Sequence, residues 1–436
     1  MKTRPNHDAT RVLMLGWEYP PRFVGGLGKA SQGLAHGLAD LGLDVVFVLP
    51  QFDSRRDGRR LRVIGAHNWN VHHHGSIIPR QAGGRHLLPL AARLSPYANP
   101  DPTTPGADLP VGDPRRIYGS ELGREVRRFA TQAGAIARCA QADVVHAHDW
   151  MTFPAAMAIA QREHLPWFVH VHSTEYDRAG SGANPDVAAI EQAACQQATG
   201  VFAVSDYTRR IIIERYGVPP ERVRVIYNAP DGPIRAAASQ PIDRREPWIV
   251  FVGRLTFQKG PDHFLRAAAD VARWHPQARF ILCGTGDMRG RLEQQSHELG
   301  IADRVEFRGF VAPRQIDKLL ARSSLLVMPS VSEPFGLVAL EALRAGTPII
   351  VSRQSGVREV ISHSLQADFW DTDKLADQML AVLRLPTLAC QLVDEGRSQL
   401  AMLSWHASAL GIIEAYARAG IRVPDELGHI GAEATS

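Results

Sequence analysis

Short apolar runs alternate with longer amphipathic segments along most of the chain. In the first half, the runs that predict strands are Arg11 to Leu15, Asp44 to Leu49, Val144 to Ala147, Trp167 to Val171, Gly200 to Val204 and Val223 to Ile226. Helices are expected at about Gly28 to Leu41, near Phe153 to His164 and from Asp186. Runs that are apolar throughout are typical of parallel strands covered by helices on both faces. The first half is therefore predicted to be a doubly wound α/β domain.

The same alternation restarts after a polar stretch that contains prolines, from Asp231 to Pro247. The strands expected beyond it are Trp248 to Val252, Arg279 to Cys283, Val305 to Arg308, Leu325 to Met328 and Pro348 to Val351. An apolar helix at about Trp405 to Ala417 lies beyond this second set, and we expect it to cross back to the first domain. The pattern indicates two similar α/β domains in sequence.

The length agrees with this division, because 436 residues exceed what one ordinary core accommodates. We expect an N-terminal domain at 1–235, a second domain at 247–404, a helix at 405–420 that packs back, and a frayed tail at 421–436. The segment Gln51 to Tyr118 is rich in Gly, Pro, Arg and His and has little periodicity. It is predicted to be an irregular, partly ordered insertion on the acceptor side of a cleft between the domains.

Composition narrows the class of protein. Hydrophobic residues make up 45% of the chain and charged residues 22%, and no stretch approaches the roughly 20 apolar residues of a membrane span. The polar N-terminus has no apolar segment typical of a secretory signal. Acidic and basic residues are interleaved at a net charge of +4, which disfavours nucleic-acid binding. The four scattered cysteines are predicted to be reduced packing residues, so a cytoplasmic location is expected.

The strongest chemical signal is a pair of carboxylates, Glu333 and Glu341, in the run E-P-F-G-L-V-A-L-E. Pro334 disfavours helical geometry at Glu333, so this residue is expected in a loop after the strand Leu325 to Met328. A helix is predicted from about Gly336 to Ala345, with Gly346 ending it. A helix N-terminus attracts phosphate, and a carboxylate beside it accepts hydrogen bonds from hydroxyls. A ligand that carries both groups, such as a nucleotide sugar, fits this segment.

Two glycine-containing turns also follow predicted strands. The loop G-R-L-T-F-Q-K-G places Arg254 and Lys259 where the first strand of the second domain ends, and such a pair of cations suits a diphosphate. The turn G-G-L-G, which begins at Gly25 and Gly26, allows close approach of a ligand to the backbone. It lacks the G-x-G-x-x-G pattern of a nicotinamide enzyme, and a plain strand-to-helix turn is the alternative.

Other polar clusters carry weaker signals. His170 and His172 end a strand and should point to the same side of it, and the run His146 to Asp149 resembles them. Neither histidine pair has a third ligand at a familiar spacing, so no metal site is predicted. The D-x-D motif that ends at Asp373 precedes a helix, and Asp373 is expected to be its N-cap.

Taken in chain order, several motifs resemble glycosyltransferase family 4. They are G-W-E-Y-P-P with G-G-L-G, H-A-H-D-W, H-V-H-S-T-E, A-V-S-D-Y-T, G-R-L-T-F-Q-K-G, G-T-G-D-M and S-E-P-F-G-L-V-A-L-E. The H-A-H-D-W motif after G-G-L-G is most similar to the glycogen and starch synthase branch. The resemblance implies a GT-B fold, in which two Rossmann-like domains face a central cleft. It also implies retaining transfer of a sugar from a nucleoside diphosphate sugar, without a required metal or other cofactor.

The resemblance also implies roles for individual residues. Arg254 and Lys259 would hold the diphosphate, Glu333 the sugar hydroxyls, Glu341 the ribose, and His172 the sugar near its reacting carbon. Further donor contacts would come from Gly25, Gly26, Phe335, Gly336 and Leu337. The acceptor hydroxyl would approach from the face that the leaving group departs from, and a phosphate oxygen would take its proton.

The resemblance favours a hexosyltransferase that moves glucose, from ADP- or UDP-glucose, to a glucan or related glycan. Two alternatives stay open: a family 4 enzyme acting on a lipid-linked or cell-envelope glycan, and an inactive nucleotide-sugar-binding protein. An Arg-rich stretch from Ser54 to Arg62 hints at the peripheral membrane contact that the first alternative needs. Bacterial glycogen synthases have lysine where Phe23 stands and commonly cysteine where Phe335 stands. Arg22 and Lys29 are the candidates for the missing charge.

Overall fold

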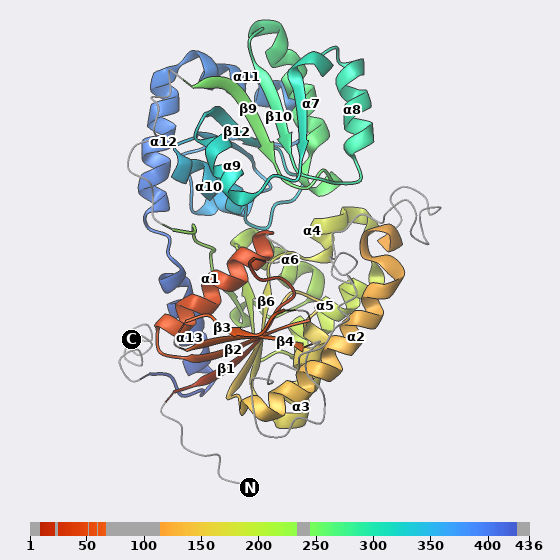
Figure 1. Cartoon of the computed structure of the whole chain (residues 1–436), viewed down its shortest axis with the longest axis vertical. Coiled ribbons are helices and arrows are strands. Elements are labelled where there is room, and N and C mark those ends of the chain that lie inside the picture. Colours follow the sequence, from red (N-terminus) through yellow and green to blue (C-terminus); the bar gives the residue numbers. More distant parts are fainter. Residues whose placement is uncertain are drawn as a thin grey trace.

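The computed structural model describes residues 9–21, 25–50, 52–58, 60–66, 114–232 and 245–424, with residues 114–121 described by their backbone alone. Two separate parallel sheets form the centres of two domains (Figure 1). The first domain lies in the lower half of this view and the second in the upper half, and both have helices on each side of their sheet. The GT-B type of architecture expected from the motifs is therefore present.

The first sheet has eight strands in the order β3-β4-β2-β1-β5-β6-β7-β8. The strands are β1 (Arg11–Leu15), β2 (Asp44–Leu49), β3 (Arg55–Arg56), β4 (Leu61–Gly65), β5 (Val144–His148), β6 (Trp167–Val171), β7 (Gly200–Ala203) and β8 (Val223–Val225). All neighbours in the sheet are parallel except β3 and β4.

The second sheet has six strands, all parallel, in the order β11-β10-β9-β12-β13-β14. The strands are β9 (Glu246–Val252), β10 (Arg279–Cys283), β11 (Val305–Gly309), β12 (Ser323–Met328), β13 (Ile349–Ser352) and β14 (Leu365–Ala367). The carboxyl ends of these strands all lie along one edge, which faces the first domain in Figure 1.

Helices cover both faces of each sheet. In the first domain they are α1 (Gly26–Asp40), α2 (Pro114–Ala140), α3 (Phe153–Glu163), α4 (Glu175–Ala179), α5 (Pro185–Gln197) and α6 (Asp206–Tyr216). In the second domain they are α7 (Pro261–Trp274), α8 (Arg289–Glu298), α9 (Pro313–Leu320), α10 (Leu337–Ala345), α11 (Thr372–Arg384) and α12 (Pro386–Leu400), and α13 (Trp405–Arg418) follows them.

Alternate residues of each central strand enter different cores, because side chains alternate across a strand. Leu13 of β1 packs with α2 and α3, whereas Met14 packs on the opposite face with α1 and α13. The C-terminal helix α13 contributes the buried residues Ile412 and Tyr416 to this second core. Helix α13 thus completes this core of the first domain.

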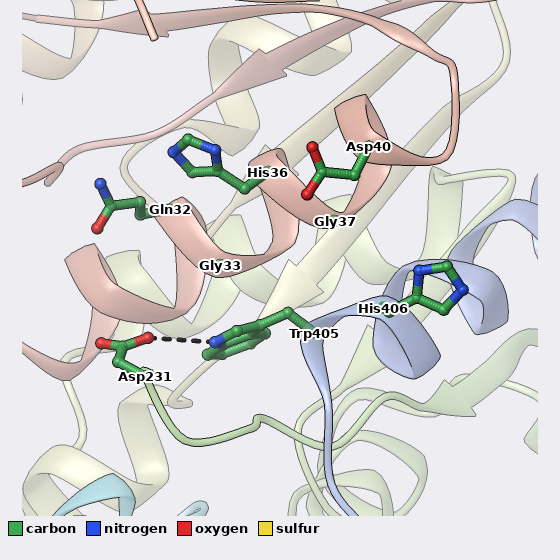
Figure 2. Close-up of a pocket in the computed structure, with 8 residues that line it drawn as sticks. All are labelled: Gln32, Gly33, His36, Gly37, Asp40, Asp231, Trp405 and His406. Carbon is green, nitrogen blue, oxygen red and sulfur yellow. Dashed lines mark hydrogen bonds between the residues drawn. The ribbon is translucent and has the colours of Figure 1, made fainter. Parts of the chain in front are cut away.

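Close contact between α1 and α13 depends on two glycines of α1. The ring of Trp405 lies over Gly33, where an added Cβ would come within 2.2 Å of the ring, and the Trp405 carbonyl oxygen would lie 2.6 Å from a Cβ on Gly37. The Trp405 indole N–H donates to Asp231 Oδ1 at 3.1 Å, beside α1 (Figure 2). The two helix backbones approach each other closely because glycine has no Cβ at either position.

The structure corrects several expectations. The predicted irregular insertion begins with regular structure, because β3 and β4 fall inside it, and it ends within α2. The predicted tail is not frayed at its start, since Ile421 is buried and the Arg422 carbonyl accepts a hydrogen bond from Thr10. Asp371, rather than Asp373, is the N-cap of α11 and accepts from the backbone N–H of Lys374. Cys390 is exposed, although all four cysteines are free.

Other parts of these expectations lie outside the described residues. They are residues 67–113 of the insertion, residues 233–244 of the expected linker, residues 425–436 of the tail, and the positions of Arg22 and Phe23.

Candidate active site

The loop between β12 and α10 holds Glu333 in a fixed position. Lys259, which comes from the turn Phe257–Lys259 after β9, donates to both carboxylate oxygens of Glu333 at 2.9 and 2.8 Å. Ser330 donates to the same carboxylate at 3.1 Å, and Glu333 is only 7% exposed. Two of the predicted site residues therefore form one hydrogen-bonded ion pair at the carboxyl edge of the second sheet.

Gly336 shapes the start of α10. Its φ of +109° is in the left-handed region, and a Cβ there would lie 2.9 Å from Met328 Cε, so the turn requires glycine. The helix begins at Leu337, one residue later than predicted, and Gly346 ends it as expected. The side chain of Phe335 is buried against Tyr227, so only its backbone remains available to a ligand.

Glu341 on α10 meets the other domain. Lys29 on α1 donates to its carboxylate across the gap between the domains, and both side chains are largely buried. Lys29 is one of the two residues proposed to replace the lysine that is absent at position 23. It thus contacts Glu341, the residue expected to bind ribose.

Arg254 lies in the same loop as Lys259. It is linked through Gln258 to the loop that carries Glu333. Its guanidinium donates to Gln258 Oε1 at 2.9 Å, and the carbonyl of Gln258 accepts from the N–H of Val331 at 2.9 Å. The two loops that carry Arg254, Lys259 and Glu333 are therefore held together without any ligand.

Glu18 in the first domain faces Arg254. The N–H groups of Gly25 and Gly28 donate to its carboxylate, and a Cβ on Gly25 would lie 2.9 Å from Glu18 Oε2. Burial raises the pKa of Glu18 to about 7, against the opposing attraction of Arg254. The turn G-G-L-G is thus shaped around the buried carboxyl group of Glu18, which is not among the predicted site residues.

Four histidines from β5, β6 and the residue after β6 form a stack. The rings of His146, His148, His170 and His172 lie 4.5 to 5.5 Å apart between stacked neighbours, with interplanar angles of 6 to 28°. His170 and His172 do point to the same side, as predicted. Burial lowers the pKa of His146 and of His172 to about 3 and those of the other two well below the usual value, so all four rings are neutral.

Three of these histidines have nitrogens close to one another, which raises the question of a metal. The ligand atoms of His146, His148 and His170 lie within 4.8 Å of one another. A tetrahedral Zn²⁺ site with Zn–N bonds of about 2.0 Å needs nitrogens roughly 3.3 Å apart, each with its lone pair directed at the ion. Nearly parallel rings direct their lone pairs into separate planes, so this stack does not fit a metal without rearrangement.

Asp149 holds the backbone of His172, the first residue after β6. Its Oδ1 accepts the backbone N–H of His172 at 2.7 Å, and its own backbone has a left-handed φ of +58°. Burial raises its pKa to about 7, opposed mainly by Arg178. Strain of this kind is tolerated where neighbouring contacts hold it, and it is common at functional sites.

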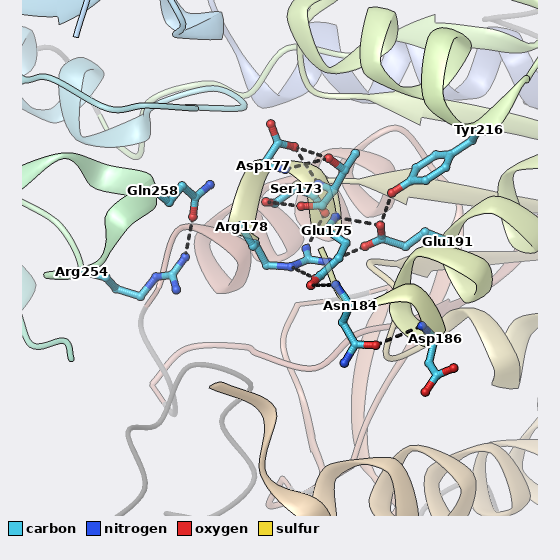
Figure 3. Close-up of polar contacts among 11 residues, drawn as sticks. Ser173, Glu175, Asp177, Arg178, Asn184, Asp186, Glu191, Tyr216, Arg254 and Gln258 are labelled. Atoms are coloured by element: carbon cyan, nitrogen blue, oxygen red, sulfur yellow. Dashed lines mark hydrogen bonds and ion pairs between the residues drawn. The ribbon is translucent and has the colours of Figure 1, made fainter. Parts of the chain in front are cut away.

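A buried ionic network supports the loop after β6 (Figure 3). Arg178 pairs with Glu175 at 3.1 Å and with Glu191 at 2.5 Å, and burial raises the pKa of Glu191. Thr174 and Asp177 form a capping box at the start of α4. Asp177 Oδ1 also accepts from Ser332 of the second domain at 2.5 Å, next to Glu333. The loop that carries His172 is thereby tied to the loop that carries Glu333.

A second link between the domains lies at the N-terminus of α6. The Glu359 carboxylate accepts from the backbone N–H groups of Asp206 and Tyr207 at 2.7 and 2.8 Å. Ser205 donates to the Pro334 carbonyl at 2.6 Å. These contacts satisfy N–H groups that a helix start leaves free and place Pro334 against the first domain.

A separate pocket of about 400 Å³ lies along α1, between this helix and the start of α13 (Figure 2). Gln32, His36 and Asp40 of α1 line it together with Asp231 and His406. It contains none of the predicted site residues.

The structure brings Lys259, Glu333 and Arg254 into one connected group, and it places Glu341 opposite α1 and His172 in a loop tied to Glu333. Sequence reasoning did not select Glu18, and it weighed the run that contains His148 and Asp149 only as a metal site. Their only signal was their position in the motifs G-W-E-Y-P-P and H-A-H-D-W, at or just after the ends of β1 and β5.

Comparisons with known proteins define the class. The fold matches that of sucrose-phosphate synthase from Thermosynechococcus elongatus, with a TM-score of 0.70, 22% identity and coverage of 94% of this chain and 99% of that one. It also matches HepE of Anabaena, solved in complex with UDP-glucose, with a TM-score of 0.64, 17% identity and coverage of 94% and 99%. The fold is thus that of GT-B glycosyltransferases.

Sequence comparison is more specific. Residues 25–229 match the glycosyl transferase 4-like domain and residues 235–399 match glycosyl transferases group 1. An uncharacterized glycosyltransferase of Methanocaldococcus jannaschii is 30% identical over 388 residues, which cover 85% of this chain and 87% of the relative. The glycogen synthase of Mycobacterium tuberculosis is 29% identical over 431 residues, 95% and 96% of the two chains. The chain belongs to glycosyltransferase family 4.

Proposed function

We propose that the protein is a retaining hexosyltransferase that transfers glucose from a nucleoside diphosphate glucose to a glucan or a related glycan. The observation that carries the proposal is the connected group of Arg254, Lys259 and Glu333, which the contact between Ser332 and Asp177 ties to the loop of His172. This arrangement offers two cations for a diphosphate and a carboxylate for sugar hydroxyls at one place.

In this proposal each residue has a distinct task. Arg254 and Lys259 bind the diphosphate and stabilise the charge that grows on it as the glycosyl bond breaks. Glu333 accepts hydrogen bonds from sugar hydroxyls. Glu341 accepts hydrogen bonds from the ribose, and in the free protein its carboxylate accepts one from Lys29. His172 contacts the sugar near its reacting carbon, and backbone groups of Gly25, Gly26 and Phe335 to Leu337 complete the donor site.

The reaction exchanges one glycosidic bond for another. The bond from the anomeric carbon to the diphosphate oxygen breaks, and a bond to the acceptor oxygen forms on the same face of the sugar. The departing phosphate oxygen takes the proton of the acceptor hydroxyl, so the products are the extended glycan and the nucleoside diphosphate. The proposed reaction requires no metal, so transfer should persist in EDTA.

Two kinds of relative support the choice of donor and acceptor. Similarity to a glycogen synthase over nearly the whole chain favours a glucan, and the fold is shared with a protein solved in complex with UDP-glucose. A D-inositol 3-phosphate glycosyltransferase of Frankia alni is 30% identical over 303 residues, which cover 64% of this chain and 74% of that relative. A small phosphorylated polyol is therefore the acceptor to compare with a glucan.

The lipid-linked alternative depends on arginines of one stretch in the first domain. In the described part of the Ser54 to Arg62 stretch, Arg55 pairs with Asp57 and Arg60 with Asp44, whereas Arg56 is exposed. No helix among the described residues is long and apolar enough to cross a membrane.

A thermal-shift panel tests donor binding. ADP-, UDP- and GDP-glucose are each added to the protein, and the cognate donor is expected to raise the melting temperature, because binding to the folded state alone stabilises it. Arg254→Ala should lose this shift. If no nucleoside diphosphate glucose shifts the wild-type protein, the proposal is contradicted.

A further inference from the structure

The stacked histidines form two hydrogen-bonded chains. In one, His148 Nδ1 and His172 Nε2 are 2.9 Å apart. In the other, Tyr416 Oη lies 2.7 Å from His146 Nδ1, and His146 Nε2 lies 3.3 Å from His170 Nδ1. Each chain ends at a buried nitrogen, Nε2 of His148 or Nε2 of His170, that has no hydrogen-bond partner among the described residues.

The positions of the protons follow from these unpartnered ends. A neutral imidazole has one N–H donor and one acceptor nitrogen, and burial keeps all four rings neutral. Among buried backbone groups, orphaned N–H donors are rarer than under-satisfied acceptors, and we expect the same preference for buried imidazole nitrogens. The two unpartnered Nε2 atoms are therefore the acceptors, and each ring carries its proton on Nδ1.

We propose that His148 is a positioning residue that holds His172 with its proton on Nδ1, so that His172 presents an N–H donor to an oxygen of the bound sugar. The proposal rests on the proposed function for the ligand that His172 meets. The tautomer of His172 can be measured in the free protein, without any activity.

The direction of the hydrogen bond between His148 and His172 fixes which nitrogen of His172 is the donor. With its proton on Nδ1, His148 donates to Nε2 of His172, and the remaining nitrogen of His172 must then be the donor. His148 is fully buried, whereas His172 keeps part of its surface exposed, so the chain runs from the interior toward the cleft. The backbone N–H of His172 is held by Asp149, and its ring stacks on His170 at 4.5 Å, so the ring is fixed at three places.

Two substitutions at the same position separate the bond from the packing. In His148→Asn the amide nitrogen takes the place of Nδ1 and can still donate to His172. In His148→Phe the donor is lost, but an aromatic ring is retained in the stack. The ring centroid of Phe47 already lies 6.0 Å from that of His148. Tyr416→Phe serves as a control, because it removes a hydroxyl from the other chain.

The first measurement is a long-range proton–nitrogen correlation spectrum of the full-length protein labelled with ¹⁵N-histidine, with His172 assigned by its absence in His172→Gln. The expected result is a proton on Nδ1 of His172 in the wild type, in His148→Asn and in Tyr416→Phe, and a mixture of tautomers in His148→Phe. A wild-type His172 with its proton on Nε2 overturns the proposal, whether or not the variants fold.

The second measurement is the steady-state kinetics of transfer. His148→Phe should lower kcat at least tenfold, and His148→Asn should stay within about threefold of the wild type. Equal loss in both variants, with unchanged melting temperatures, would show that only packing matters at this position and would overturn the proposal. If no donor supports transfer at all, the proposed function fails, while the spectrum still decides the tautomer.

Discussion

Single side chains at the carboxyl edge of the second sheet are held before any substrate arrives. Lys259 donates to both oxygens of Glu333, and Arg254 is fixed through Gln258. Preorganised charges stabilise a transition state more effectively than charges that must first reorient. At the scale of residues, the free protein already has the arrangement that the proposed reaction needs.

The first prediction concerns these cations. Arg254→Ala and Lys259→Ala are each expected to lower kcat on the order of 100-fold or more, because both act on charge that grows in the transition state. Steady-state transfer assays measure the effect. Lys374→Ala, at an exposed lysine of α11, is the matched control and should be silent. Near-normal turnover in both cleft variants would refute their roles.

A second prediction concerns Glu341. The ribose keeps its structure during the reaction, so a residue that binds it should contribute equally to the ground and transition states. Glu341→Gln is expected to raise the KM for the donor at least about tenfold with a smaller change in kcat, since a hydrogen bond to a charged group is worth about 1.5 to 3 kcal/mol. A large loss of kcat at unchanged KM would argue against ribose binding.

A third prediction concerns pH and Glu18. Burial raises its pKa from 4.5 to about 7 in the folded state, so the folded protein binds more protons than the unfolded chain between these values. The contribution of Glu18 to the free energy of unfolding is complete below pH 4.5 and is lost as the pH rises to about 7. The loss is about 3 kcal/mol, at roughly 1.4 kcal/mol per pKa unit.

Glu18→Gln removes this dependence. Denaturant unfolding of both proteins from pH 5 to 8 should show the wild type losing stability relative to the variant as the pH rises. A constant difference across that range would mean that Glu18 is not titrating there.

Residue identities were easier to predict than residue partners. Arg254, Lys259 and Glu333 could be selected because each follows a strand end, where open α/β sheets bind ligands. That Lys259 contacts Glu333, 74 positions away, depends on the order of β9 and β12 in the sheet, which no local pattern contains. Glu18 and Asp149 were not selected because burial, rather than sequence, makes them unusual.

At the scale of elements, the contact between α1 and α13 requires glycine at two positions of α1. Gly33 and Gly37 leave room for Trp405, whose ring and carbonyl would otherwise lie within 2.6 Å of a Cβ. The carbonyl is backbone and cannot rotate away, so an alanine at Gly37 must separate the helices.

We therefore predict that Gly37→Ala lowers the free energy of unfolding by about 1 to 3 kcal/mol, the usual cost of overpacking, although alanine is the better helix former. Gly290→Ala in α8 is the control, since nothing lies within 4 Å of its added Cβ. It should be neutral or stabilise by roughly 0.5 to 1 kcal/mol. Equal effects of the two substitutions, measured by denaturant unfolding, would contradict the packing argument.

Apolar strands were predictable wherever both faces are buried. β1, β2 and β6 have the bounds expected from their apolar runs. β4 was hidden because it lies near one edge of the sheet, where arginines flank and interrupt its apolar residues Leu61, Val63 and Ile64. The N-cap of α11 was misplaced by two residues, because Asp371 and Asp373 lie on either side of the helix start at Thr372 and only the backbone decides which one caps it.

At the scale of the whole molecule, the two domains meet through contacts that flank the site. Ser332 bonds to Asp177 on one side, and Glu359 bonds to the first turn of α6 on the other. Lys29 and Glu341 connect α1 to α10. The loop from Ser332 to Gly336 is thus placed by both domains, so donor binding and the relative position of the domains should be coupled.

The domain order and the fold could be predicted from alternating strands and helices, since parallel sheets with helical connections constrain topology strongly. The contacts between domains could not, because they join polar residues from loops whose positions follow from both folded domains.

The most direct test of the central claim is a proton NMR time course of the wild-type protein with ADP- or UDP-glucose and a maltooligosaccharide acceptor, with D-inositol 3-phosphate in parallel. The account predicts loss of the donor's anomeric signal and growth of a new α-glycosidic signal, at a rate that EDTA leaves unchanged. A β-glycosidic product would contradict the retaining mechanism. No transfer from any nucleoside diphosphate glucose to any of these acceptors would contradict the proposed function itself.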